Sequence, residues 1–157
     1  MAAFEPRDPD FEARVRADFG RQGLMDTLGA TLVEVRPGEV TIALPFRADL
    51  TQQHGYMHAG AITAIVDSAC GYAALSLIPA GVEVLTVEYK VNFLAPASGS
   101  RFVARGRVTK PGRTLTVCTG DVVVRDDDGR ERHVATMLAT IMAVPPRVEG
   151  QPSSSAF

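Results

Sequence analysis

Apolar and polar residues alternate along most of this chain, and one segment departs from that pattern. From Gly55 to Val82, Asp67 is the only acidic residue, and the segment contains no Lys or Arg. A helix over roughly 58–77 with no clear polar face belongs in a protein interior. A lone ionisable group inside such a helix is costly unless it is paired, hydrogen-bonded or facing a cleft. The pattern therefore predicts a buried central helix and marks Asp67 as a candidate functional group.

The chain before this helix carries two simpler patterns. Apolar residues recur every four positions from Phe11 with Arg and Asp between them, which predicts a short amphipathic helix ending near Gly20 or Gly23. Two alternating runs, at 28–35 and 40–44, then flank a Pro-Gly turn. We expect them to form a hairpin.

After the central helix the chain reads as long strands joined by short turns, at roughly 85–93, 102–108, 114–125 and 132–143. The first has the cleanest period of two, with one predicted face made of Leu85, Val87, Tyr89, Val91 and Phe93. Strands and helices do not alternate as βαβ units, so a parallel doubly wound sheet is disfavoured. The prediction is an α+β fold, in which an antiparallel sheet wraps around one long central helix beside a short N-terminal helix.

Length and composition fit one ordinary domain. The 157 residues are 46% hydrophobic and 22% charged, which suits a single globular domain over 10–145. We expect residues 1–9 to be a flexible arm and 146–157 a disordered tail. The net charge of −2 offers no field for nucleic acid or anionic lipid. The chain opens without a signal peptide, and its longest apolar segment is too polar for a membrane span, so we expect a cytoplasmic protein.

The two cysteines, Cys70 and Cys118, form neither a disulfide framework nor a metal-ligand pattern. We interpret them as buried thiols in a reducing compartment. No metal and no cofactor are expected.

The start of the central helix offers chemistry of its own. Backbone N–H groups in the first turn, at Ala59 and Gly60, lack intrahelical partners, and the helix dipole favours negative charge in front of them. A developing oxyanion fits such a place. His58 could cap the helix, orient the loop or transfer protons. For Asp67, the structural alternative is a carboxylate that caps a loop or pairs with an arginine.

Three segments of the chain resemble the motifs of a known family. The loop Gln-His-Gly-Tyr-Met-His-Ala-Gly at 53–60 ends seven residues before Asp67. The run at 86–97, TVEYKVNFLAPA, ends in a proline turn, and the turn PGRT follows at 111–114. In these segments the chain resembles the PaaI-like branch of the hotdog-fold acyl-CoA thioesterases, whose long strand also ends in a proline turn. The resemblance spans roughly residues 20–143 with the same order of elements.

The resemblance implies roles for individual residues. The family's helix usually opens with His-Gly-Gly, and His58-Ala59-Gly60 matches with Ala in the middle, a mild departure because that position supplies a backbone N–H. Asp67 matches the catalytic carboxylate, acting as a general base or as a nucleophile through an anhydride. Gln52 would help to place the thioester carbonyl or the water. Thr86 would hydrogen-bond near that water.

The resemblance also implies partners. The site would lie between two protomers, so that a homodimer is obligatory, and dimers of this family commonly pair into tetramers. The substrate would be an acyl-CoA, whose phosphates call for positive charge at the entrance. Arg113 is the first candidate, with Lys110 beside it. Further candidates for contacts with the substrate or CoA are Asn92, Tyr56 and His54.

Three alternatives stay open. A non-catalytic acyl-CoA sensor with the same fold would not require a buried carboxylate. A hotdog acyl dehydratase or hydratase would use a His paired with an acid in a differently spaced loop, which this sequence lacks. A serine or cysteine hydrolase is disfavoured, because there is no Gly-x-Ser-x-Gly elbow and neither Ser68 nor Cys70 has an obvious His partner.

Overall fold

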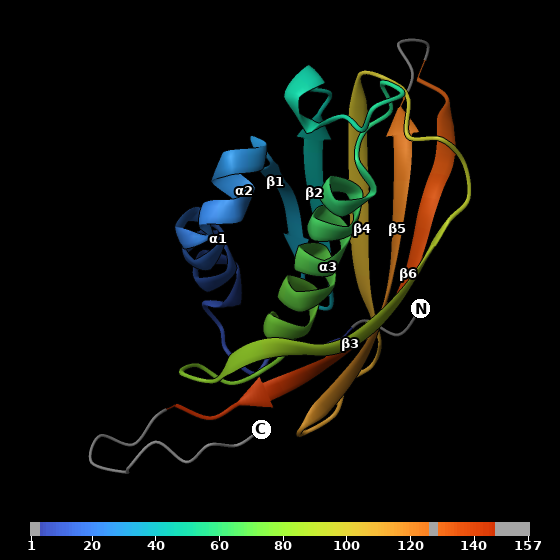
Figure 1. The fold of residues 1–157 in the computed structure, drawn as a ribbon. Helices are drawn as coiled ribbons and strands as arrows, with labels where there is room; N and C mark the ends of the chain where they lie inside the picture. The colour runs from blue at the N-terminus through green and yellow to red at the C-terminus, as the bar shows by residue number, and fades with distance from the viewer. Residues whose placement is uncertain (1–3, 126–128, 147–157) are drawn as a thin grey trace, which may run out of the picture.

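A single antiparallel sheet wraps around one central helix in the computed structural model, which describes residues 4–125 and 129–146 (Figure 1). Within these residues the sheet has six strands in the order β1-β2-β4-β5-β6-β3. Their bounds are β1 Thr31–Arg36, β2 Glu39–Pro45, β3 Glu83–Phe93, β4 Arg101–Lys110, β5 Leu115–Arg125 and β6 Glu131–Val144. The predicted α+β architecture, the first hairpin and the four later strands are confirmed. The turn expected between the last two strands lies mostly outside the described residues, which omit 126–128.

Helices cover one face of the sheet. Their bounds are α1 Phe11–Arg21, α2 Gly23–Leu28 and α3 Ala59–Leu75, with a short 3₁₀ turn η1 at Ala48–Leu50. Helix α2 was not predicted, since its six residues are too few to show a helical period. It ends at Gly29, whose φ of 71° is left-handed, so the first strand starts at Thr31 and not at Leu28. No helix among the described residues is long and apolar enough to cross a bilayer.

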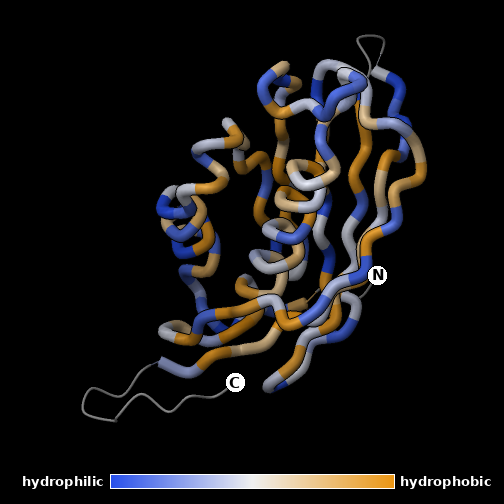
Figure 2. The backbone as a smooth tube through the Cα atoms, viewed as in Figure 1, coloured by the Kyte–Doolittle hydropathy of each residue, from blue (hydrophilic) through white to orange (hydrophobic). Residues whose placement is uncertain are grey.

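Alternation along the strands builds the core between the sheet and α3, and Figure 2 shows it as orange and blue stretches following one another. On β4 the side chains of Phe102, Ala104 and Val108 are buried while the arginines between them point outward. On β6 one face is buried as well, at Ala135, Met137, Ala139 and Ile141. These faces position α3, and thereby Asp67, against the middle of the sheet.

Two facing glycines let α3 approach the sheet closely. Gly106 of β4 pairs with Gly120 of β5. A Cβ at Gly106 would overlap the backbone carbonyl group of Ala69, and one at Gly120 would lie 2.9 Å from the Cys70 sulfur. Because Gly106 and Gly120 have no side chains, the backbone of α3 can lie close against the sheet at this point.

Replacing Gly106 with Ala should lower the free energy of unfolding by about 3 kcal/mol, because the new methyl meets helix backbone, which cannot rotate away. Urea unfolding followed by circular dichroism measures the change. The matched control is Gly20→Ala in α1, where a Cβ meets nothing within 4 Å, so that this change should be neutral or slightly stabilising. Equal stability of both variants would contradict the close approach.

Arg14 of α1 holds the C-terminal end of α3. Its Nη2 donates to the carbonyls of Leu75, at 2.7 Å, and Ile78, at 2.9 Å, and its Nη1 donates to that of Pro79, at 2.8 Å. These carbonyls lie at and just beyond the helix end, where backbone acceptors lack intrahelical donors. The guanidinium also pairs with the buried Asp8 at 3.2 Å. The two helices are thereby fixed relative to each other beside the cavity described below.

The two chain ends differ from the rest. Residues 1–9 were expected to be a flexible arm, and from Phe4 onward they lie against the fold. The Phe4 ring packs against the core, and a Cβ at Gly38 would collide with it. The expected disordered tail at 146–157 falls outside the described residues, except for Pro146.

The predicted face of β3 was wrong in its first half. The pairing with β6 shifts between Thr86 and Glu88, which leaves Val87 as a β-bulge. Directly paired residues point to the same face, and Thr86 is paired with the buried Ile141. The bulge therefore turns Thr86 toward α3 and Leu85 away from it, whereas Tyr89, Val91 and Phe93 keep the inward face that pairs with the buried residues of β6.

Candidate active site

Asp67 lies in the middle of α3 and meets one polar partner from the sheet. The Thr86 hydroxyl donates to Asp67 Oδ1 over 2.8 Å. The bulge at Val87 makes this contact possible by turning Thr86 inward. Burial raises the pKa of Asp67, and the hydrogen bond from Thr86 opposes that shift. Asp67 neither caps a loop nor pairs with an arginine within the described residues, since no loop N–H and no arginine bonds to its carboxylate.

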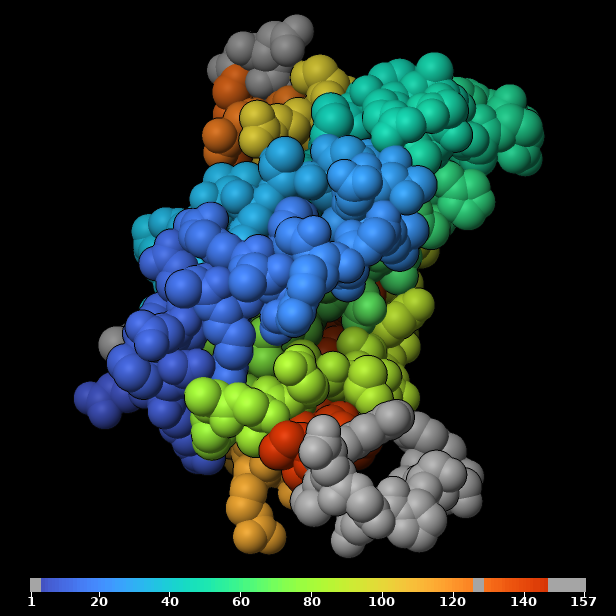
Figure 3. All heavy atoms as spheres, turned by 90° about the vertical axis from the view of Figure 1, so that its left-hand side faces the viewer, coloured from blue at the N-terminus to red at the C-terminus, as the bar shows by residue number. Residues whose placement is uncertain are grey.

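Asp67 opens into a cavity of about 360 Å³. Its walls come from α1, α3 and the first half of β3. Figure 3 shows the opening as a hollow between the blue helices and the yellow-green β3, with green atoms of α3 at its base. Along α3, the side that is only half-buried runs through Thr63, Asp67, Ser68 and Gly71. The carboxylate is thus reachable from solvent.

The loop before α3 is held in a tight turn. Thr51 and Met57 form a bridge, the Gln52 N–H donates to the Tyr56 carbonyl over 2.9 Å, and Gly55 has a left-handed φ of 82°. The Gln52 side-chain oxygen accepts from the His54 N–H. This turn leaves Tyr56 at 40% exposure.

His58 caps the helix. It is the N-cap residue, with φ −62° and ψ 137°, and its Nδ1 accepts a hydrogen bond from the Gly60 N–H over 2.8 Å. The Ala59 N–H, by contrast, has no protein partner within the described part of the chain. The first turn of α3 therefore presents an exposed donor at Ala59, with the Gly60 N–H already engaged.

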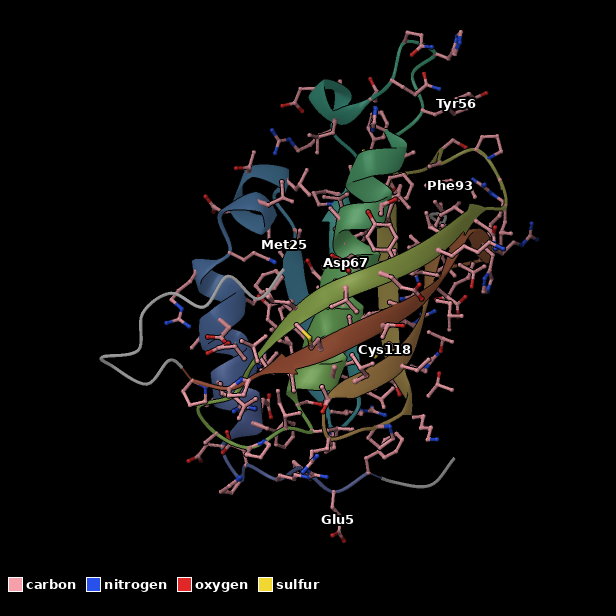
Figure 4. All side chains as sticks on the ribbon, turned by 60° about the horizontal axis from the view of Figure 1, so that its bottom comes forward. Glu5, Met25, Tyr56, Asp67, Phe93 and Cys118 are labelled. Atoms are coloured by element: carbon pink, nitrogen blue, oxygen red, sulfur yellow. The ribbon has the colours of Figure 1, made fainter. Side chains whose placement is uncertain are left out.

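The Asp67–Thr86 pair and the cluster at the start of α3, formed by Gln52, His58, Ala59 and Gly60, do not meet within one protomer. Asp67 follows Ala59 by eight residues, which places it about 12 Å along the helix axis. The cavity at Asp67 and Thr86 includes none of Gln52, His58, Ala59 and Gly60. In Figure 4, Asp67 lies beside β3, whereas Tyr56 lies beyond the N-terminal end of α3.

The edge of the sheet beside Asp67 is apolar and uncovered. β3 is the last strand in the sheet order. Tyr89 and Phe93 face inward, yet each is 48% exposed. An open strand edge with uncovered apolar side chains is a typical surface for pairing with another chain.

The remaining predicted residues lie elsewhere. Lys110 ends β4, and Arg113 lines a separate, mainly apolar cavity of about 380 Å³ together with Ile78 and Pro79. Asn92 is paired with Thr136 on the outer face of β3. None of the three contacts the Asp67 cavity of the same protomer.

Sequence reasoning missed part of the cavity wall. Asp18 comes from α1 and Gln22 from the junction of α1 and α2, and Gln22 accepts a 3.3 Å hydrogen bond from Ser68. Tyr72 contributes from α3. The one available signal was helical spacing, which puts Ser68 and Gly71 within about one turn of Asp67 and Tyr72 about 1.4 turns from it. Nothing in the sequence indicates that α1 lies over this cavity.

The cysteines are buried and free, as predicted. Burial raises the pKa of the Cys118 thiol to about 12 and that of Cys70 well above its usual value. Both thiols therefore stay protonated at neutral pH and are poor nucleophiles.

Comparisons with known proteins agree with this fold. Residues 54–131 match the sequence model of a family described as "Thioesterase superfamily". A thioesterase family protein from Silicibacter pomeroyi, known from its crystal structure, is 52% identical and has a TM-score of 0.83 over 86% of this chain and 98% of its own. The PaaI protein of E. coli, from the phenylacetic acid degradation operon, shares the fold with a TM-score of 0.78 at 17% identity, over 87% of this chain and 95% of its own. The 1,4-dihydroxy-2-naphthoyl-CoA hydrolase of Listeria monocytogenes is 25% identical over 60% of this chain and 77% of its own length.

Proposed function

The chain belongs to the thioesterase superfamily and has its hotdog fold, and on this basis we propose that it hydrolyses acyl-CoA thioesters to a free acid and CoA. The observation that carries the proposal is the reachable, half-buried Asp67 carboxylate that is held by Thr86 and lines a cavity. The Listeria monocytogenes relative, whose name describes an acyl-CoA hydrolase, supports the choice of substrate.

Asp67 starts the reaction in this proposal. Its ionised carboxylate either takes a proton from a water molecule, which attacks the thioester carbonyl, or attacks the carbonyl itself to form an anhydride that water then cleaves. Both routes need the ionised form. Thr86 donates to Oδ1 and so orients the carboxylate and favours its charge.

The Ala59 N–H stabilises the negative charge that develops on the carbonyl oxygen. It lies at the positive end of the α3 dipole and has no other partner among the described residues. His58, by engaging the Gly60 N–H, fixes the first turn and so the direction of the Ala59 donor. We assign Gln52 to the same cluster, as the side chain that places the carbonyl or the water.

The two clusters act together across a dimer. Because Ala59 lies about 12 Å from Asp67 along one helix, a thioester group cannot reach both within one protomer. We propose that the exposed β3 edges of two protomers pair, so that the first turn of α3 in one faces Asp67 of the other. Tyr89 and Phe93 would be covered by this contact. Such dimers would pair again into a tetramer.

The CoA part of the substrate needs cations. Lys110 and Arg113 lie outside the Asp67 cavity of their own protomer, and we propose that they meet the phosphates across the assembly. Asn92, Tyr56 and His54 are all exposed and remain proposed contacts for the substrate or CoA.

Replacing Thr86 with Val should move the acid limb of the kcat/KM profile to higher pH. The hydroxyl stabilises the ionised carboxylate, so its loss raises the pKa of Asp67 further. Less of the enzyme is then ionised at mildly acidic pH, and activity falls there first. The measurement is kcat/KM from pH 4 to 9, with Thr86→Ser as the control that keeps the hydroxyl. An unshifted limb in Thr86→Val would remove Thr86 from this role.

The activity itself is tested with a panel of short, medium, long and aryl acyl-CoAs and a reagent that traps the released thiol. We expect turnover of at least one class. Tight binding of CoA without any hydrolysis across the panel would support a non-catalytic acyl-CoA sensor in its place.

A further inference from the structure

The cavity that contains the Asp67–Thr86 pair extends to a second end, which other residues line. Tyr72 lies about 7.5 Å further along the axis of α3 than Asp67. Glu83 lies about 10 Å from Thr86 along β3. Both residues line the same cavity as the Asp67–Thr86 pair. A thioester held at Asp67 would therefore point its acyl group toward Tyr72 and Glu83.

This far end carries negative charge with no cation in the wall. Asp18 and Glu83 line it, and the described residues that form the cavity include no Lys, Arg or His. Asp18 pairs with Arg21, but the Arg21 side chain is 75% exposed, and such an exposed pair offsets the charge only in part. Glu83 has no ion-pair partner among the described residues.

The pKa of Tyr72, which lies in the cavity wall, reflects the same negative charge. Its ring packs against Phe19 with the centroids 6.0 Å apart. Burial, with the nearby carboxylates of Asp18 and Glu83, raises the pKa of Tyr72 to about 12. The phenol stays protonated at neutral pH and remains a neutral hydrogen-bonding group. Ser68 and Gln22 add further neutral polar groups.

We infer that Asp18 and Glu83 are specificity-determining residues, which exclude acyl groups ending in a carboxylate and admit acyl groups with a neutral end. The inference rests on the proposed thioester hydrolysis and names the substrate class of that site. A carboxylate entering this end would leave water for a wall that holds two charges of the same sign, of which only that of Asp18 is offset in part, by the exposed Arg21, and this is unfavourable. A methyl or hydroxyl group meets no such repulsion.

Three acyl-CoAs of equal chain length test the inference on the intact protein: hexanoyl-CoA, 6-hydroxyhexanoyl-CoA and adipoyl-CoA, which differ only at the far end. We expect kcat/KM for adipoyl-CoA to be lower than for the other two by about tenfold or more at pH 7. Equal values for all three would overturn the inference while leaving the hydrolysis proposal intact.

Charge-neutralising variants assign the effect to residues. Glu83→Gln and Asp18→Asn should each raise the adipoyl-to-hexanoyl ratio, and the double variant should raise it most. Glu88→Gln is the matched control, since Glu88 is an exposed carboxylate on the same strand that accepts from Thr140 and does not line the cavity. If Glu88→Gln changed the ratio as much as Glu83→Gln, net charge and not the cavity wall would be the cause.

If none of the three compounds is hydrolysed, binding measurements test the exclusion of carboxylate-ended acyl groups separately from the proposed hydrolysis. Calorimetric titration of the same three acyl-CoAs into the intact protein then gives the discrimination without turnover. Weaker binding of adipoyl-CoA, by about tenfold, would keep the cavity assignment and count against the enzymatic one. Equal binding would overturn the inference.

Discussion

The variant Asp67→Asn should lose about 10³-fold in kcat, because the carboxamide can neither accept a proton from water nor attack the thioester. KM should change little, since the shape of the side chain is kept and Thr86 can still donate to the remaining oxygen. The measurement is steady-state hydrolysis of the best acyl-CoA found in the panel. Retention of wild-type turnover would show that Asp67 is not the catalytic group.

Stability measurements distinguish this loss from misfolding. Burial raises the pKa of Asp67, so the folded state favours the protonated form more than the unfolded state does. The contribution of this carboxyl to stability is therefore greatest at low pH and is lost as the pH rises through the raised pKa. Asparagine is neutral at every pH, and the variant should be at least as stable as the wild type at pH 7. A catalytic carboxylate held at a cost in stability is common in active sites.

Replacing Ala59 with Pro should lower kcat by about 10²–10³-fold, because proline has no N–H to stabilise the oxyanion. The position tolerates proline unusually well. Ala59 is the first residue of α3, where proline is favoured, and His58 before it has φ −62° and ψ 137°, which a following proline permits. The effect should appear in hydrolysis assays with the thermal unfolding temperature unchanged.

Ala59→Ser is the matched control for that variant. It alters the side chain and keeps the N–H, so its turnover should stay within a few-fold of the wild type. Full activity of Ala59→Pro would move the oxyanion-stabilising role away from the helix start.

Local patterns predicted most of the fold because burial and alternation agree along the strands. Phe102, Ala104 and Val108 on β4 point inward as their spacing indicates. The phase of β3 was wrong because the bulge at Val87 depends on pairing with β6, which no single strand reveals. Helix α2 was missed because it is short.

The residues of the candidate site likewise fall into those that the sequence indicated and those that it did not. Asp67 and Thr86 were singled out from an isolated charge and a family resemblance, and the fold brings them together. Asp18 and Gln22 carry no such signal, because their position over the cavity depends on how α1 docks, in part through Arg14. The separation of Ala59 from Asp67 follows from helix geometry alone, and it is the reason why we propose a site shared between two protomers.

Mixed dimers test the shared site most directly. The central claim is that Asp67 of one protomer acts with Ala59 of the other, so a dimer of one Asp67→Asn subunit and one Ala59→Pro subunit contains one intact site and one doubly defective site. Co-expression with two different affinity tags, followed by purification over both tags at a dilution where light scattering shows dimers and no tetramers, yields only these mixed dimers. They should recover about half of the wild-type turnover, while each homodimeric variant stays nearly inactive. Mixed dimers that are no more active than the two homodimers would place both groups in one protomer and contradict the claim.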